Sequence, residues 1–103
     1  MAFERVATRA DVPAGSVGVF QVNGRSIALA NLDGERFYAL DNVCTHDNGP
    51  LGEGRIQAET VECPRHGARF DVKTGQVRAL PAVRPVRTYP VELDGDEVRV
   101  DVG

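Results

Sequence analysis

Short runs of alternating apolar and polar residues dominate the chain, and they predict strands rather than helices. Apolar positions recur along residues 17–31 on both sides of Asn23-Gly24, a pair that tolerates the positive φ angles of a tight two-residue turn. A second turn at Asp33-Gly34 leads into a further run over residues 36–40. We therefore expect the first forty residues to form an antiparallel meander.

The C-terminal residues repeat this pattern. Residues 91–93 and 98–102 alternate with a period of two on either side of Asp94-Gly95. This pattern predicts a hairpin with one apolar face and one solvated face. No convincing long helical period occurs between the two ends, so the fold class expected from the pattern is all-β.

The middle of the chain differs in composition from its ends. Residues 42–81 are richer in glycine, proline and polar residues and contain only short strand-like runs. These runs are residues 55–57, 60–62, 69–72 and 76–78. We interpret the chain as a single domain, residues 1–103. Its base is an antiparallel β-sandwich of residues 1–41 and 82–103, and a small subdomain at about 42–81 is inserted into it.

Charge and length narrow the classes of partner. The 103 residues carry 12 Lys and Arg against 15 Asp and Glu, a net charge of −3, which argues against nucleic acid. Charges occupy the N-terminal residues where a signal peptide would need an apolar run. No stretch approaches the roughly 20 apolar residues of a membrane span. The expectation is a soluble cytoplasmic protein that binds neither nucleic acid nor membrane.

All the cysteines and histidines lie in one stretch, residues 44–66. They form two compact pairs, Cys44 with His46 and Cys63 with His66, and sixteen residues separate the pairs. Glycine and proline accompany both pairs, so each pair is expected on a turn-rich loop. Such an arrangement predicts two loops that face one metal centre.

The ligand order bears on which metal is bound. A tetrahedral Cys₂His₂ zinc site is chemically possible, but zinc sites usually group the two cysteines and the two histidines separately. A Rieske [2Fe–2S] centre needs two thiolates on one iron and two imidazoles on the other, and two loops with one Cys and one His each supply them. The pattern C-x-H, about sixteen residues, C-x-x-H resembles the Rieske family. The resemblance implies a Rieske-like fold, a cluster-binding subdomain and one [2Fe–2S] cluster per chain. Cys44 and Cys63 would bind one iron, and His46 and His66 the other.

Other residues indicate which group of the Rieske family this chain resembles. Residues 80–82, Leu-Pro-Ala, resemble the proline loop that covers the cluster in this family. Respiratory and photosynthetic members carry a disulfide between the two loops, whereas residues 47–51 contain no cysteine and Arg65 stands at the second site. Those members also place Ser and Tyr where this chain has Ala68 and Phe70. The chain thus resembles the ferredoxin component of bacterial ring-hydroxylating dioxygenase systems, with a reduction potential in the lower part of the Rieske range.

This resemblance implies a one-electron carrier between a flavoprotein ferredoxin reductase and a terminal aromatic-ring-hydroxylating oxygenase. The chain itself is not expected to be an enzyme, because no Ser/His/Asp or Cys/His set is left once the four ligands are assigned. Two alternatives remain. One is a Rieske-like small subunit of assimilatory nitrite reductase, and the other is a zinc-stapled interaction module.

Overall fold

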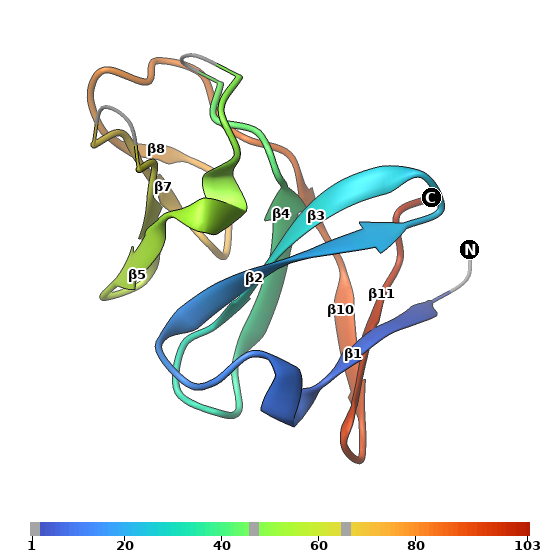
Figure 1. Ribbon diagram of the computed structural model, residues 1–103. Coiled ribbons are helices and arrows are strands. Elements are labelled where there is room, and N and C mark those ends of the chain that lie inside the picture. The colour runs from blue at the N-terminus through green and yellow to red at the C-terminus, as the bar shows by residue number, and fades with distance from the viewer. Residues whose placement is uncertain (1–2, 46–47, 65–66) are drawn as a thin grey trace.

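The structure, a computed structural model, describes residues 3–45, 48–64 and 67–103 (Figure 1). Its regular elements are nearly all strands, which confirms the all-β prediction. In chain order they are β1 (Glu4–Thr8), η1 (Arg9–Asp11), β2 (Ser16–Val22), β3 (Arg25–Asn31), β4 (Phe37–Asp41), η2 (Leu51–Glu53), β5 (Arg55–Gln57), β6 (Thr60–Glu62), β7 (Arg69–Asp71), β8 (Val77–Ala79), β9 (Thr88–Tyr89), β10 (Val91–Asp94) and β11 (Glu97–Val100). The two elements labelled η are single 3₁₀ turns.

The strands form three antiparallel sheets. The outer sheet has the order β1-β11-β10, the middle sheet β2-β3-β4-β9, and the loop-bearing sheet β5-β6-β7-β8. The predicted meander is confirmed as β2-β3-β4, and the predicted C-terminal hairpin as β10-β11. The sequence pattern missed β1, which pairs with β11 at the far end of the chain. Ala7 is the only buried residue of β1, so its apolar pattern is too weak to detect.

The central strands of the middle sheet, β3 and β4, are buried on both faces, and this gives the molecule its layers. One face packs against the outer sheet in the base core, and the other packs against the loop-bearing sheet in the loop-side core. The base core consists of Ala7, Val12, Val22, Ile27, Leu29, Phe37, Ala39, Tyr89, Val98, Val100 and Val102. The loop-side core consists of Ala30, Leu40, Cys44, Leu51, Val61, Cys63, Ala68, Phe70, Val72, Ala82 and Val86. Consecutive residues of β3 therefore point into different cores, and residues 27–31 are all buried.

The C-terminal hairpin keeps the predicted alternation. In β11, Val98 and Val100 are buried, and the alternating residues Glu97 and Arg99 are partly exposed. This difference from β3 shows that alternation marks a strand covered on one face, whereas a continuous apolar run marks a strand covered on two.

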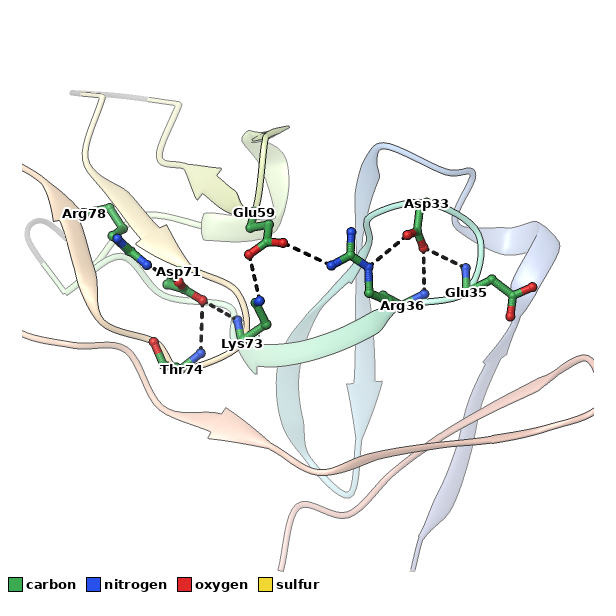
Figure 2. A network of polar contacts seen from close by, with 8 residues as sticks. All are labelled: Asp33, Glu35, Arg36, Glu59, Asp71, Lys73, Thr74 and Arg78. Atoms are coloured by element: carbon green, nitrogen blue, oxygen red, sulfur yellow. Dashed lines mark hydrogen bonds and ion pairs between the residues drawn. The ribbon is translucent and has the colours of Figure 1, made fainter.

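A network of ion pairs joins the turns of the middle and loop-bearing sheets on the solvent side (Figure 2). The carboxylate of Glu59, in the β5–β6 turn, accepts from Arg36 Nη1 at 3.0 Å and pairs with Lys73 Nζ at 2.8 Å. Arg36 Nε in turn donates to Asp33 Oδ2 at 2.9 Å. The hydrogen bonds from Lys73 and then Arg36 hold the pKa of Glu59 below its ordinary value. The network thus links three turns that are distant in sequence.

The β7–β8 turn also fastens the loop-bearing sheet to the chain that returns to the base. The backbone N–H of Gly75 donates to the carbonyl of Asp71 at 2.7 Å, and Val86 N–H donates to the carbonyl of Gly75 at 2.9 Å. Gly75 has φ +78°, and a Cβ there would lie 2.0 Å from the Val86 carbonyl oxygen. Only glycine fits this close backbone approach.

The first prediction concerns the Glu59 network. Because the folded state lowers the pKa of Glu59, its ionised form contributes stability above the unfolded-state pKa, and that contribution is lost as the pH falls through the folded-state pKa. Glu59→Gln should therefore lower the free energy of unfolding at neutral pH, and the difference from wild type should shrink in acid. Urea unfolding of both proteins across this pH range measures the effect.

The matched control is Asp96→Asn in the β10–β11 turn, because Asp96 is exposed and makes no ion pair with the described residues. This control should change stability little at any pH. A Glu59→Gln variant that is as stable as wild type at neutral pH would show that the network is not a stabilising link.

Candidate cluster site

Both predicted cysteine ligands are buried in the loop-side core. Cys44 lies three residues after the end of β4 and is 0 % exposed, and Cys63 directly follows β6 and is 1 % exposed. Neither thiol belongs to a disulfide. The two predicted histidine ligands, His46 and His66, lie outside the described residues. The fold thus brings together two thiols that are nineteen positions apart in the sequence.

The two cysteine loops are closed by the same pair of backbone hydrogen bonds. In the first loop, Cys44 N–H donates to the Gly49 carbonyl at 2.8 Å and Asn48 N–H donates to the Cys44 carbonyl at 2.7 Å. In the second, Cys63 N–H donates to the Ala68 carbonyl at 2.7 Å and Gly67 N–H donates to the Cys63 carbonyl at 3.3 Å. Each cysteine is therefore held at the base of a loop of the same size.

The fourth residue after each cysteine has a left-handed backbone. Asn48 has φ 62° and Gly67 has φ 77°. Glycine and asparagine are the residues that most readily adopt this conformation. Among the described residues, a Cβ added at Gly67 would meet only Glu62 Oε2, at 3.7 Å, so the backbone angle, not crowding, favours glycine there. The sequence analysis missed the role of Asn48, although Asn or Gly at the fourth position after each cysteine was a usable signal.

Asn42 anchors the start of the first loop. Its side-chain Nδ2 donates to Ser26 Oγ at 3.0 Å, and its Oδ1 accepts from Gly52 N–H at 2.6 Å. Its backbone N–H donates to the Ser26 carbonyl at 3.0 Å. One side chain thus ties the chain entering the loop both to β3 and to η2, which follows the loop. Sequence reasoning gave no role to Asn42, because its partners lie in distant parts of the chain.

The chain that leaves the first loop lies close to the chain that enters the second, where β5 pairs with β6. A Cβ at Gly54, where the chain leaves the first loop, would lie 1.8 Å from the carbonyl oxygen of Glu62, the residue before Cys63. The Glu62 carboxylate accepts from Arg55 Nε at 2.6 Å. This ion pair borders a cavity of about 370 Å³ that also reaches Cys63. Gly54 therefore allows the backbone before β5 to approach the end of β6, directly before Cys63.

The segment that contains residues 80–82, predicted to resemble a covering loop, is joined to the first cysteine loop at Arg84. Thr45 Oγ1 donates to the Arg84 carbonyl at 2.7 Å, and Arg84 Nη2 donates to the Thr45 carbonyl at 3.4 Å. Ala82 is fully buried in the loop-side core together with both cysteines. The Leu80–Pro81 peptide bond is cis. The segment is thus attached at the end of the molecule where both cysteines lie.

A buried tyrosine holds the strand that leads into the first loop. Tyr89 OH donates to Asp41 Oδ1 at 2.5 Å, which joins β9 to the last residue of β4. Burial, followed by this hydrogen bond, raises the pKa of Tyr89. The phenol therefore remains a protonated donor throughout the neutral range.

The donor set fits an iron–sulfur cluster. Thiolate is the form of cysteine that binds metal, and two thiolates in an apolar core need a compensating cation. Both cysteines have this environment. Within residues 3–45, 48–64 and 67–103, no group of three or more His, Cys, Asp or Glu side chains lies close enough together to hold a metal ion.

Comparison with known proteins identifies the family. The sequence matches the family described as "Rieske [2Fe-2S] domain" over residues 2–90. The chain belongs to the Rieske [2Fe–2S] domain family. The predicted family and its [2Fe–2S] cofactor are therefore confirmed.

Relatives of this Rieske domain are ferredoxin components of dioxygenase systems. This chain is 38% identical over 92 residues to the ferredoxin component of a naphthalene 1,2-dioxygenase system from Pseudomonas aeruginosa. The aligned residues cover 89% of this chain and 88% of the relative. This chain is also 38% identical over 102 residues to the ferredoxin component of biphenyl 2,3-dioxygenase from Rhodococcus jostii. The aligned residues cover 99% of this chain and 94% of the relative.

Solved structures agree with this placement. The ferredoxin of carbazole 1,9a-dioxygenase from Nocardioides aromaticivorans has a TM-score of 0.90 and 41% identity, with 97% of each chain covered. A ferredoxin solved in complex with its oxygenase in carbazole 1,9a-dioxygenase has a TM-score of 0.86 and 30% identity, covering 95% of this chain and 91% of that one. A putative nitrite reductase small subunit is 18% identical with a TM-score of 0.83, and this likeness shows the fold alone.

Proposed function

We propose that this Rieske domain holds its [2Fe–2S] cluster through four side chains, Cys44 and Cys63 on one iron and His46 and His66 on the other. The two thiols share one core, and the backbone closes both of their loops in the same way. We also propose that the base comprises residues 1–41 and 82–103 and the cluster-binding subdomain about residues 42–81. The continuous run of β5 to β8 in one sheet supports this division.

The chain carries one electron at a time between a flavoprotein ferredoxin reductase and a terminal aromatic-ring-hydroxylating oxygenase. When bound, the cluster supplies reversible one-electron chemistry. The protein fixes both cysteines at the bases of hydrogen-bonded loops and excludes water from their thiols. The single observation that carries this function is the likeness to ferredoxin components over nearly the whole length of both chains.

The same likeness favours a carrier over the two alternatives. The ferredoxin relatives share more than a third of their residues with this chain, whereas the nitrite reductase small subunit is 18% identical. The zinc-stapled module has no support from the family match, which is to a [2Fe–2S] domain.

Within the part of the chain that the structure describes, no helix is long and apolar enough to cross a membrane. We propose a cytoplasmic location, where reductase and oxygenase can both be reached by diffusion.

Reconstituted electron flow tests this function. The purified protein is combined with a flavoprotein reductase, NADH and the oxygenase components of naphthalene, biphenyl and 3-phenylpropionate dioxygenase systems, one at a time. Aromatic diol formation that requires this protein, with at least one oxygenase, is the expected result. A protein that is reduced by no reductase and supports none of the oxygenases would contradict the proposal.

The second prediction concerns the cofactor content. We expect about two irons and two acid-labile sulfides per chain in the wild-type protein. Cys44→Ser or Cys63→Ser should lose most of both, and should destabilise the loop-bearing sheet because metal binding is coupled to folding. Elemental analysis, sulfide assay and visible absorption measure these changes. One zinc per chain without sulfide would contradict the four-ligand proposal.

The third prediction concerns the reduction potential. Rieske centres span roughly −150 to +300 mV, and hydrogen bonds to the sulfur atoms are one of the factors that set the value. Ala68 and Phe70 are fully buried in the loop-side core and have no hydroxyl to donate. We expect a wild-type potential in the lower part of this range. Ala68→Ser and Phe70→Tyr should each raise it, because a donated hydrogen bond stabilises the more negative reduced state.

Protein-film voltammetry measures these potentials. Ala7→Ser is the matched control, because Ala7 is buried in the base core on the other side of the middle sheet. This control should leave the potential unchanged. A wild-type potential near the top of the Rieske range, or equal potentials in Ala68→Ser and Ala7→Ser, would contradict the prediction.

A further inference from the structure

Three charged side chains form a row across the loop-bearing sheet. Arg55 on β5 lies opposite Glu62 on β6, and Glu62 lies opposite Arg69 on β7. The Glu62 carboxylate pairs with Arg55 Nε at 2.6 Å and lies 3.9 Å from Arg69 Nε. Residues directly opposite each other in antiparallel strands point to the same face of the sheet. We call these three residues the charge row, and its two cations and one anion give it a net charge of +1.

The charge row lies at the end of the strands that leads into the second cysteine loop. Glu62 is the last residue of β6 and directly precedes Cys63. A Cβ added at Gly67, within that loop, would lie 3.7 Å from Glu62 Oε2. Glu62, Cys63 and Gly67 also border the same cavity of about 370 Å³. The carboxylate of Glu62 is therefore held against the loop that begins at a proposed cluster ligand.

The three charges differ in how far they are shielded from water. The side chain of Glu62 is 18% exposed, that of Arg69 is 39% exposed and that of Arg55 is 73% exposed. Water and dissolved ions weaken the field of an exposed charge more than that of a partly buried one. Glu62 therefore has the strongest field of the three, and the two arginines offset it.

The position of the charge row suits an effect on the cluster better than a purely structural role. The sheet already has a stabilising network at the opposite end of the same two strands, where Glu59 pairs with Lys73 and Arg36. Reduction adds one electron, and hence one negative charge, to a [2Fe–2S] cluster. A nearby anion makes this step less favourable and lowers the reduction potential, whereas a nearby cation raises the potential.

We propose that the charge row sets the reduction potential of the cluster, with Arg55 and Arg69 offsetting the potential-lowering charge of Glu62. This inference rests on the proposed cluster ligands and the proposed function. The charge row acts separately from Ala68 and Phe70, which point into the loop-side core. Arg69 lies between these two residues in the sequence, and successive residues of a strand point to opposite faces. The charge row thus adjusts the driving force for accepting and passing on each electron.

Protein-film voltammetry of the cluster-loaded protein at low ionic strength tests this proposal. Glu62→Gln should raise the potential, and Arg55→Gln and Arg69→Gln should each lower it. The double substitution Arg55→Gln/Glu62→Gln removes one charge of each sign, so its potential should lie close to that of wild type. All three single shifts should shrink as the ionic strength rises, because dissolved ions screen the charges.

The matched control is Glu59→Gln, which removes a paired carboxylate from the same sheet at the end away from the cysteine loops. This control should lower stability towards urea but leave the potential nearly unchanged. Arg55→Lys and Arg69→Lys keep the positive charge and should retain a potential close to that of wild type. Visible spectra and iron content establish that each variant carries its cluster. Arg69→Gln and Glu62→Gln decide the question if Arg55→Gln disturbs the sheet.

Two outcomes would overturn the charge-row proposal while leaving the proposed function intact. One is a shift of the potential in the same direction in Glu62→Gln and Arg69→Gln. The other is a shift in both variants that is no larger than that in Glu59→Gln. A wild-type protein without iron and sulfide would instead contradict the proposed ligands, and one that carries the cluster but passes electrons to no oxygenase would contradict the proposed function.

Discussion

The burial of β3 and β4 on both faces of the middle sheet is the constraint on which the rest of the molecule depends. Ile27 and Leu29 point into the base core, whereas Ala30 and Leu40 point into the loop-side core. Each fully buried large aliphatic side chain contributes about 1.5–3 kcal/mol relative to an exposed one. Removing either neighbouring sheet would expose one of these faces to water. The loop-bearing sheet is therefore held in place by the same apolar surface that receives Cys44 and Cys63.

Above that core, backbone geometry determines where the cysteines lie. Each loop is closed by two hydrogen bonds and needs a left-handed residue at one position, which Asn48 and Gly67 supply. Gly54 permits the close approach of the backbone before β5 to the end of β6, directly before Cys63. A site held by backbone contacts is well suited to a cluster whose charge changes on electron transfer. The cysteine ligands are already in position before that change occurs. The polar network around Glu59 lies outside the core and connects the turns of the two sheets instead.

The sequence by itself determined the features that depend on neighbouring residues. Alternation and tight turns identified the β2-β3-β4 meander and the C-terminal hairpin, because periodicity and turn chemistry are local properties. The spacing of Cys44, His46, Cys63 and His66 indicated the Rieske family, because ligand type and order restrict the metal centre. The short strands of the loop-bearing sheet were also recognised, β5 and β6 with the observed bounds and β7 and β8 with ends displaced by one residue.

Only the tertiary structure decided what covers each surface. The pairing of β1 with β11 joins the two ends of the chain, and nothing in either local pattern specifies it. The role of Asn42 depends on Ser26 and Gly52, which come from separate parts of the sequence. Likewise, Leu80 and Ala82 are both apolar, yet one is exposed and the other fully buried. An apolar residue is a candidate for burial wherever it occurs, but its burial requires a partner surface, and that surface exists only after distant segments have packed together.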